Sequence, residues 1–100
     1  MLYLYSNSFA IGGDFHFMEV KTVKVDKRAT GLKIYHLLEN SELSREEIAK
    51  FLELNSTRVI YDWTNGIKLP NTENLLNLAK LFNVQVEDIL VIYDVFLLNY

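Results

Sequence analysis

In the segment 54-LNSTRVIYDWTNGIKLP-70, several polar residues come first and apolar residues at regular spacing follow them. Ser56, Thr57 and Arg58 supply hydroxyl and guanidinium hydrogen-bond donors. An arginine can form two parallel hydrogen bonds to guanine O6 and N7, and a threonine methyl can meet a thymine methyl group. The apolar residues that follow, ending at Trp63, have the spacing of a buried helix face. The segment therefore predicts a short helix whose start contacts a polar ligand and whose rear faces the core.

Two further helices are expected before this segment. The first runs from about Thr30 to Asn40, with Thr30 as its cap, because apolar residues recur at i, i+3 and i+4. These residues are Ile34, Leu37 and Leu38. The second begins at 44-SREE-47, where a serine followed three residues later by a glutamate predicts a reciprocal capping box. Its expected buried face is formed by Ile48, Ala49 and Leu52.

The polar segment itself forms the third helix, with Asn55 or Ser56 as its cap. It should end at Gly66, since glycine most readily adopts the left-handed conformation that stops a helix, and Pro70 prevents any continuation. The last two helices are expected at about 72–82, with Asn71 or Thr72 as the cap, and at Val86–Val91.

The two ends of the chain differ from the helical part. The run 15-FHFMEVKTVKV-25 alternates apolar and polar residues, which predicts a half-buried strand. We divide the chain into an N-terminal extension (1–26), a helix-turn-helix domain (27–91) and an apolar tail (92–100). The tail is expected to extend the fifth helix or to form a strand. It is more apolar than a domain of this size needs to close its core, so we expect it to pack or to dimerise.

Residues 1–17 have two interpretations. Gly12, Gly13 and Asp14 lie shortly before Met18, as the translation of a purine-rich ribosome-binding sequence would. Met18 is therefore a candidate natural start, with 1–17 upstream of it. The alternative is that 1–17 is a genuine arm of the protein, and the codons at Gly12 and Gly13 distinguish the two.

Composition bounds the class of protein. One hundred residues, of which 50% are hydrophobic and 23% charged, suit one small globular domain whose thin core often relies on a partner subunit. Cysteine is absent, which excludes disulfides and thiolate chemistry. No secretory leader is apparent, and the apolar tail is far shorter than the roughly 20 residues that span a bilayer, so we expect a cytoplasmic protein. The net charge of −3 weighs against nucleic-acid binding, although the distribution of charge matters more than its total.

Catalysis and cofactor binding are not expected. The chain has no glycine-rich phosphate loop, no histidine–carboxylate cluster and no activated nucleophile. His16 and His36 have no partner at metal-ligand spacing, so we expect no metal site and no cofactor.

Two short helices joined by a few residues form a helix-turn-helix, whose second helix enters the DNA major groove. The runs 43-LSREEIAKFLEL-54, 60-IYDWTNGIKLP-70 and 73-ENLLNLAKLFNVQVEDIL-90 resemble the lambda-repressor-like family, the Cro/repressor or XRE-type regulators of bacteria and phage. The resemblance covers about residues 27–91. It implies an all-α, five-helix domain, double-stranded operator DNA as the ligand, and a homodimer.

Transferred position by position, the resemblance implies two sets of DNA contacts. The base-reading candidates are Ser56, Thr57, Arg58 and Tyr61. The candidates for contacts to the DNA backbone are Ser44, Arg45 and Lys68. Trp63 is expected to be buried behind them.

The chain departs from the family at two places. The family tends to carry basic residues at four positions where this chain has Asp62, Thr64, Asn65 and Ile67. Glu53 occupies the turn between the second and third helices, where glycine is frequent, so a left-handed residue other than glycine is expected there. Because few phosphates would be neutralised, DNA binding should depend only weakly on salt. A second function stays open, an antitoxin-like or adaptor module on the same fold that binds a protein and little DNA.

Overall fold

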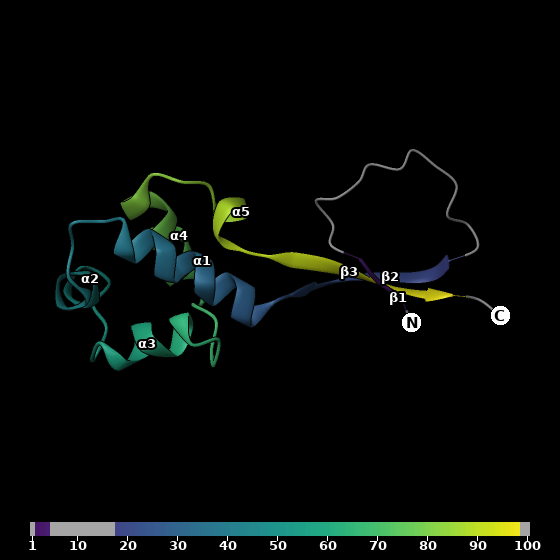
Figure 1. Cartoon of the computed structure of the whole chain (residues 1–100), viewed down its shortest axis with the longest axis horizontal. Helices are drawn as coiled ribbons and strands as arrows, with labels where there is room; N and C mark the ends of the chain where they lie inside the picture. Colours follow the sequence, from purple (N-terminus) through teal and green to yellow (C-terminus); the bar gives the residue numbers. More distant parts are fainter. Residues whose placement is uncertain (1, 5–17, 99–100) are drawn as a thin grey trace. The chain divides into compact units, whose positions relative to one another are not determined.

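The computed structural model describes residues 2–4 and 18–98 (Figure 1). The backbone divides into two units: Lys27–Val91, which is helical, and the segments on either side of it, whose described strands form a sheet. The prediction of an all-α, five-helix domain with β-structured extensions is confirmed. The interpretation of 1–17 concerns mainly residues 1 and 5–17, which lie outside the described residues, as does His16.

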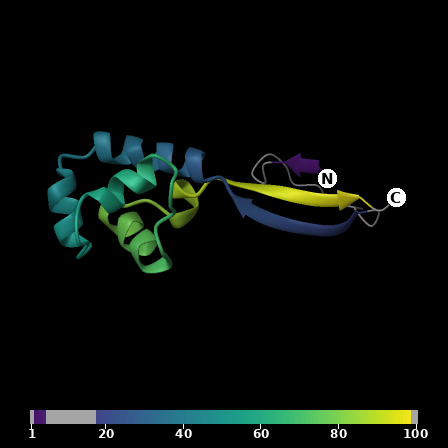
Figure 2. The same ribbon diagram turned by 90° about the horizontal axis from the view of Figure 1, so that it is seen from below.

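The helical unit consists of α1 (Lys27–Glu39), α2 (Arg45–Phe51), α3 (Arg58–Thr64), α4 (Thr72–Phe82) and α5 (Val86–Ile89). Figure 2 shows α2 beyond the C-terminal end of α1, with the other helices gathered along one side of α1. One core joins all of them; it contains Ile34, Leu38, Ile48, Ala49, Leu52, Ile60, Trp63, Leu78, Ala79 and Ile89. Helices as short as α2, α3 and α5 are unstable alone, so this packing holds them. No helix in the described part of the chain is long and apolar enough to cross a membrane.

The start of α1 differs from the prediction. The helix begins at Lys27, so Thr30 lies inside it and is not its cap. Thr30 is fully buried, and its Oγ1 accepts a hydrogen bond of 2.9 Å from the N–H of Val91. The apolar stripe marked only the part of the helix that faces the core. The first turn is formed by small and charged residues, which carry no such signal.

Two predicted helix caps are confirmed. At α2 the Ser44 hydroxyl accepts a hydrogen bond from the Glu47 N–H at 3.1 Å, and the Glu47 carboxylate accepts one from the Ser44 N–H at 2.9 Å. At α4 the Asn71 side chain accepts a hydrogen bond from the Asn74 N–H at 2.8 Å. Because these bonds close within one helical turn, residues a few positions apart are enough to specify them.

The capping box is expected to make the stability of the fold depend on pH. The hydrogen bond from the Ser44 N–H, and secondly the one with the Ser44 hydroxyl, lower the pKa of the Glu47 carboxyl from its ordinary value of 4.5. A carboxyl whose pKa is depressed by folding stabilises the fold above its unfolded-state pKa, and loses this effect as the pH falls through the folded-state pKa. In thermal melts, the melting temperature of wild type should therefore approach that of Glu47→Gln below pH 4.5. Glutamine retains the capping geometry but does not titrate. A difference in melting temperature between the two proteins that stays constant as the pH falls below 4.5 would contradict the prediction.

The fifth helix is shorter than predicted. α5 ends at Ile89 and not at Val91, and Leu90 is extended with φ −78° and ψ 131°. The tail then continues as a strand, β3 (Ile92–Leu98), which is one of the two predicted outcomes.

The sheet unit has three described strands. β3 lies between β1 (Leu2–Leu4) and β2 (Met18–Val25) and is antiparallel to both. Within the described residues, β2 confirms the strand that the alternation at 15–25 predicted. Its pairing with β3 is irregular between Met18 and Val20. Asp94 and Val95 of the central strand are buried.

Candidate nucleic-acid interface

α2 and α3 are joined by a tight turn that contains a left-handed residue. Glu53 has a φ of 56°, as expected for this position. Two backbone hydrogen bonds close the turn: the Glu53 N–H donates to the Lys50 carbonyl at 3.2 Å, and the Leu54 N–H donates to the Ala49 carbonyl at 2.8 Å. A left-handed conformation costs a residue other than glycine roughly 1–2 kcal/mol. The packing of the helices on either side must offset this cost.

The start of α3 corrects the predicted cap. Thr57 occupies the cap position, and its side chain makes no capping hydrogen bond; the cap is neither Asn55 nor Ser56. The Ser56 hydroxyl instead accepts a hydrogen bond of 3.3 Å from the Arg58 N–H. Three adjacent residues of the capping type leave the helix start ambiguous in the sequence, and the geometry of the turn selects among them.

One side of α3 is anchored in the core and the other side is exposed. Ile60 is 0% exposed and Trp63 is 3% exposed, which confirms Trp63 as a core residue. Arg58 is exposed, and Tyr61 is 47% exposed. Ser56, directly before the helix, is also exposed. The helix can therefore present polar side chains to a ligand without disturbing the core behind them.

Arg45, predicted to contact the DNA backbone, is engaged within the protein. One of its terminal nitrogens, Nη2, forms an ion pair with Oε2 of Glu39 at 3.1 Å. Its guanidinium carbon lies 5.6 Å from the ring centroid of Tyr61, and a cation is attracted to an aromatic face at such a distance. Its Nε is buried and has no hydrogen-bond partner among the described residues. Arg45 thus holds the Tyr61 ring in position, a contact for which the sequence carried no signal.

The loop after α3 presents Lys68. Gly66 is left-handed with a φ of 71°, which confirms the predicted helix stop. The carbonyl of Asp62 accepts hydrogen bonds from the N–H of Ile67 at 2.9 Å and from the N–H of Lys68 at 3.3 Å. The loop therefore folds back against the end of α3. Ile67 and Lys68 remain exposed.

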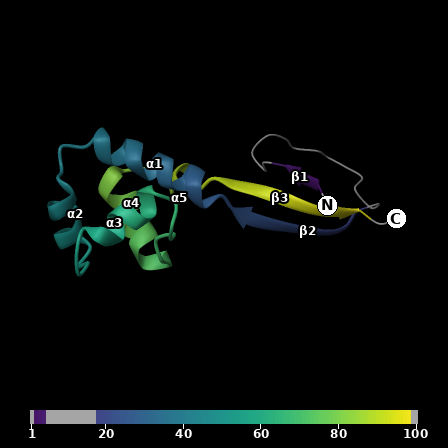
Figure 3. The same cartoon turned by 60° about the horizontal axis from the view of Figure 1, so that its bottom comes forward.

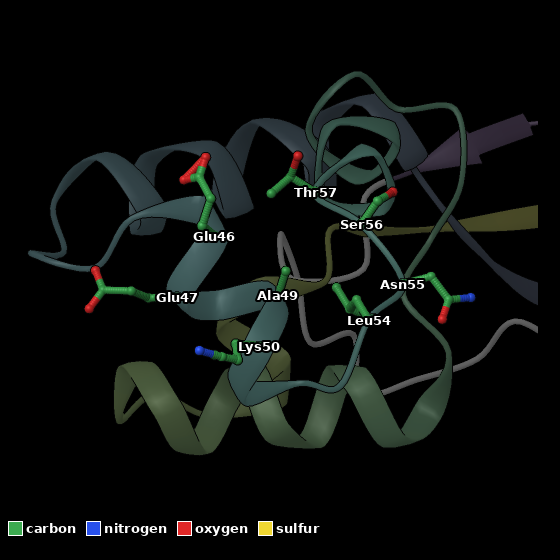
Figure 4. A pocket seen from close by; sticks show the side chains of 8 residues that line it. All are labelled: Glu46, Glu47, Ala49, Lys50, Leu54, Asn55, Ser56 and Thr57. Carbon is green, nitrogen blue, oxygen red and sulfur yellow. The ribbon is translucent and has the colours of Figure 1, made fainter.

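A shallow groove of about 410 Å³ lies between α2 and the start of α3 (Figure 4). It is lined by Glu46, Glu47, Ala49, Lys50, Leu54, Asn55, Ser56 and Thr57. Its charged residues are two carboxylates, Glu46 and Glu47, and one amine, Lys50. Figure 4 shows Glu46 and the half-buried Thr57 at the same end of the groove. The excess of negative charge disfavours a phosphate here. The sequence indicated these carboxylates as part of a helix start, but not that Glu46 and Thr57 lie at the same end of one groove.

The predicted contact residues differ in how available they are. Those that are exposed are Ser44, Ser56, Arg58, Tyr61 and Lys68, and those that are half-buried are Arg45 and Thr57. The Ser44 hydroxyl already accepts a hydrogen bond from the Glu47 N–H. Arg58 and Lys68 are therefore the exposed cations of this set, one at each end of α3.

Part of the chain is similar to known proteins. The helix-turn-helix family model matches residues 34–89, which is more than half of the chain. A comparison with curated proteins finds no match. Among solved structures, the chain is similar to the solution structure of the SOS-response transcriptional repressor LexA from Eubacterium rectale. The identity is 26% and the TM-score 0.59, over 64% of this chain and 67% of that chain. The chain belongs to the helix-turn-helix family, in agreement with its resemblance to the lambda-repressor-like regulators.

Proposed function

We propose that this protein is a sequence-specific, DNA-binding transcriptional regulator whose α3 lies in the major groove. The observation that carries the proposal is the exposure of Arg58 and Tyr61 on α3, and of Ser56 directly before it, while Ile60 and Trp63 anchor the helix from behind. In a helix-turn-helix, side chains near the start of the second helix contact base edges while the first helix crosses the backbone. Membership of the family and likeness to a transcriptional repressor support the same function.

Each predicted contact residue has a role in this proposal. Arg58 donates two hydrogen bonds to a guanine, the most frequent specific contact in the major groove. Ser56, Thr57 and Tyr61 contact neighbouring base edges. The DNA backbone is contacted by Ser44, Arg45 and Lys68. Neither this function nor the alternative below assigns a catalytic activity.

We further propose that two copies bind one operator with two-fold symmetry. A two-fold dimer uses the same surface on both copies, so that surface must be self-complementary and is usually apolar at its centre. The sheet unit supports such a surface, because Val23 of β2 is 56% exposed and the tail that forms β3 is strongly apolar. Residues 92–100 would then serve packing or dimerisation.

A second candidate function is a protein-interaction module, antitoxin-like or adaptor-like. A shallow groove is lined by Leu43, Glu47, Lys50, Phe51 and Leu81, and Phe51 is 57% exposed. The two carboxylates that line the groove between α2 and the start of α3, Glu46 and Glu47, also favour this function, because they weaken attraction to phosphate. In this case the apolar groove, and not α3, would contact the partner.

Selection of bound sequences from a random duplex library tests the leading proposal. We expect enrichment of two related half-sites whose centres are about 10 base pairs, or a multiple of this, apart. A symmetric site would indicate that two copies bind together, and its enrichment would indicate that the protein recognises specific bases. No enrichment, together with no binding to a random duplex at low salt, would favour the interaction module.

A further inference from the structure

The first turn of α1 places basic side chains beside the loop that follows α3. Lys27 and Arg28 are both exposed. A Cβ atom added to Gly66 would lie 3.0 Å from the Cα and 3.0 Å from the Cγ of Arg28. The aliphatic stem of Arg28 therefore passes directly over Gly66. Figure 3 shows the corresponding helices, with the N-terminal end of α1 near the C-terminal end of α3.

A third cation lies in the same region. Lys68 follows Gly66 by two residues, and backbone hydrogen bonds to Asp62 fix the loop that carries it. Among the residues that the structure describes, Lys27, Arg28 and Lys68 form no ion pair. The nearby acid on α3, Asp62, is half-buried, whereas the three cations are exposed. The C-terminal end of α3 is thus flanked by positive charge, in contrast to the acidic groove at its N-terminal end.

We propose that Arg28, with Lys27 beside it, forms a second contact to DNA phosphates from α1, next to the contact made by Lys68. This inference rests on the proposed function. A guanidinium matches two phosphate oxygens with parallel hydrogen bonds, and Gly66 allows the Arg28 stem to lie close to the loop.

The dimensions of α3 and of DNA agree with this placement. α3 spans Arg58–Thr64, which at a rise of 1.5 Å per residue is about 9 Å, and Gly66 follows two residues later. The major groove is about 12 Å wide, a distance that the helix and this turn together can cover. When Arg58 contacts a base edge, the loop at Gly66 can therefore reach the sugar–phosphate backbone at the border of the groove. Arg28 lies against that loop and reaches the same phosphates.

The test compares the binding of a fluorescent random-sequence duplex by wild type, Arg28→Gln, Arg28→Lys and Lys80→Gln over a range of salt concentrations. Lys80, an exposed cation of α4, serves as the matched control. Arg28→Gln should bind about fivefold more weakly at low salt. The fall of log K with log salt concentration should also become shallower, by about one unit of slope for each subunit bound. Arg28→Lys should keep the slope, and Lys80→Gln should behave as wild type.

The possible failures are distinguishable. If wild type binds and Arg28→Gln matches Lys80→Gln in both affinity and slope, the α1 contact is wrong while the proposed function stands. If wild type does not bind at low salt, the proposed function itself is wrong. Circular dichroism melts identify a temperature at which every variant is folded, and binding is measured there, so that loss of the Arg28–Gly66 contact is not mistaken for loss of a phosphate contact. An equal loss on random and selected duplexes supports the proposal, since phosphate contacts carry no sequence information.

Discussion

Replacing Gly31 with alanine is expected to lower the free energy of unfolding by about 3 kcal/mol. In an exposed helix this substitution would stabilise the fold by roughly 0.5–1 kcal/mol. Gly31 is buried in α1, however, and an added Cβ would overlap the carbonyl oxygen of Trp63. The same Cβ would lie 3.1 Å from the Thr64 carbonyl oxygen and 3.2 Å from the Gly66 nitrogen. All three are backbone atoms, so no side chain can rotate away, and α1 and α3 must separate.

Urea denaturation measures the effect of Gly31→Ala. The midpoint should fall with little change in the slope m, and the melting temperature should fall by roughly 12–24 °C. Lys33→Ala, an exposed substitution in the same helix, is the control and should change stability by less than about 0.5 kcal/mol. An alanine variant as stable as wild type would show that α1 does not approach α3 so closely. Because α3 carries Arg58 and Tyr61, which are proposed to contact the bases, the same variant should also weaken DNA binding.

Replacing Arg58 with alanine is expected to lower the affinity for a selected duplex by about 10- to 100-fold per subunit, the effect of one bidentate contact to guanine. Arg58 is exposed in the first turn of α3, and the fold does not depend on its side chain. Its N–H, which donates to the Ser56 hydroxyl, remains in the variant. The helix start should therefore persist, and stability should change little. Fluorescence anisotropy at one fixed salt concentration measures the loss.

The comparison between two duplexes decides the role of Arg58. Affinity for a random duplex should fall much less than affinity for the selected one, because a base contact contributes discrimination. Arg58→Lys keeps the charge but loses the planar fork, so it should recover binding to random duplex more than preference for the selected site. An equal loss on both duplexes would assign Arg58 to a phosphate and leave Tyr61 as the principal base-reading residue.

The sequence by itself determined the local features of the helices. The capping box of Ser44 and Glu47, the Asn71 cap and the left-handed stop at Gly66 all appear as predicted. Trp63 is in the core, and Glu53 takes the left-handed conformation that its place in the turn required. Each of these features depends on hydrogen bonds within one turn or on a repeating apolar pattern. Residues a few positions apart therefore encode them. The exposure of Ser56, Arg58 and Tyr61 follows from the same pattern, because the spacing of the apolar residues identifies the side of the helix that is buried.

Only the tertiary structure decided how the helices meet. The Thr30 hydroxyl is used by Val91, 61 positions away, and so is not a helix cap. Arg45 engages Glu39 and Tyr61, and Arg28 lies over Gly66. No local pattern encodes such contacts, since they depend on the angles and distances at which helices pack. The charge around α3 is likewise a property of the assembled fold: carboxylates of α2 flank its start, and cations of α1 flank its end. Side chains distant in sequence share one surface only after the core has set the positions of the helices that carry them.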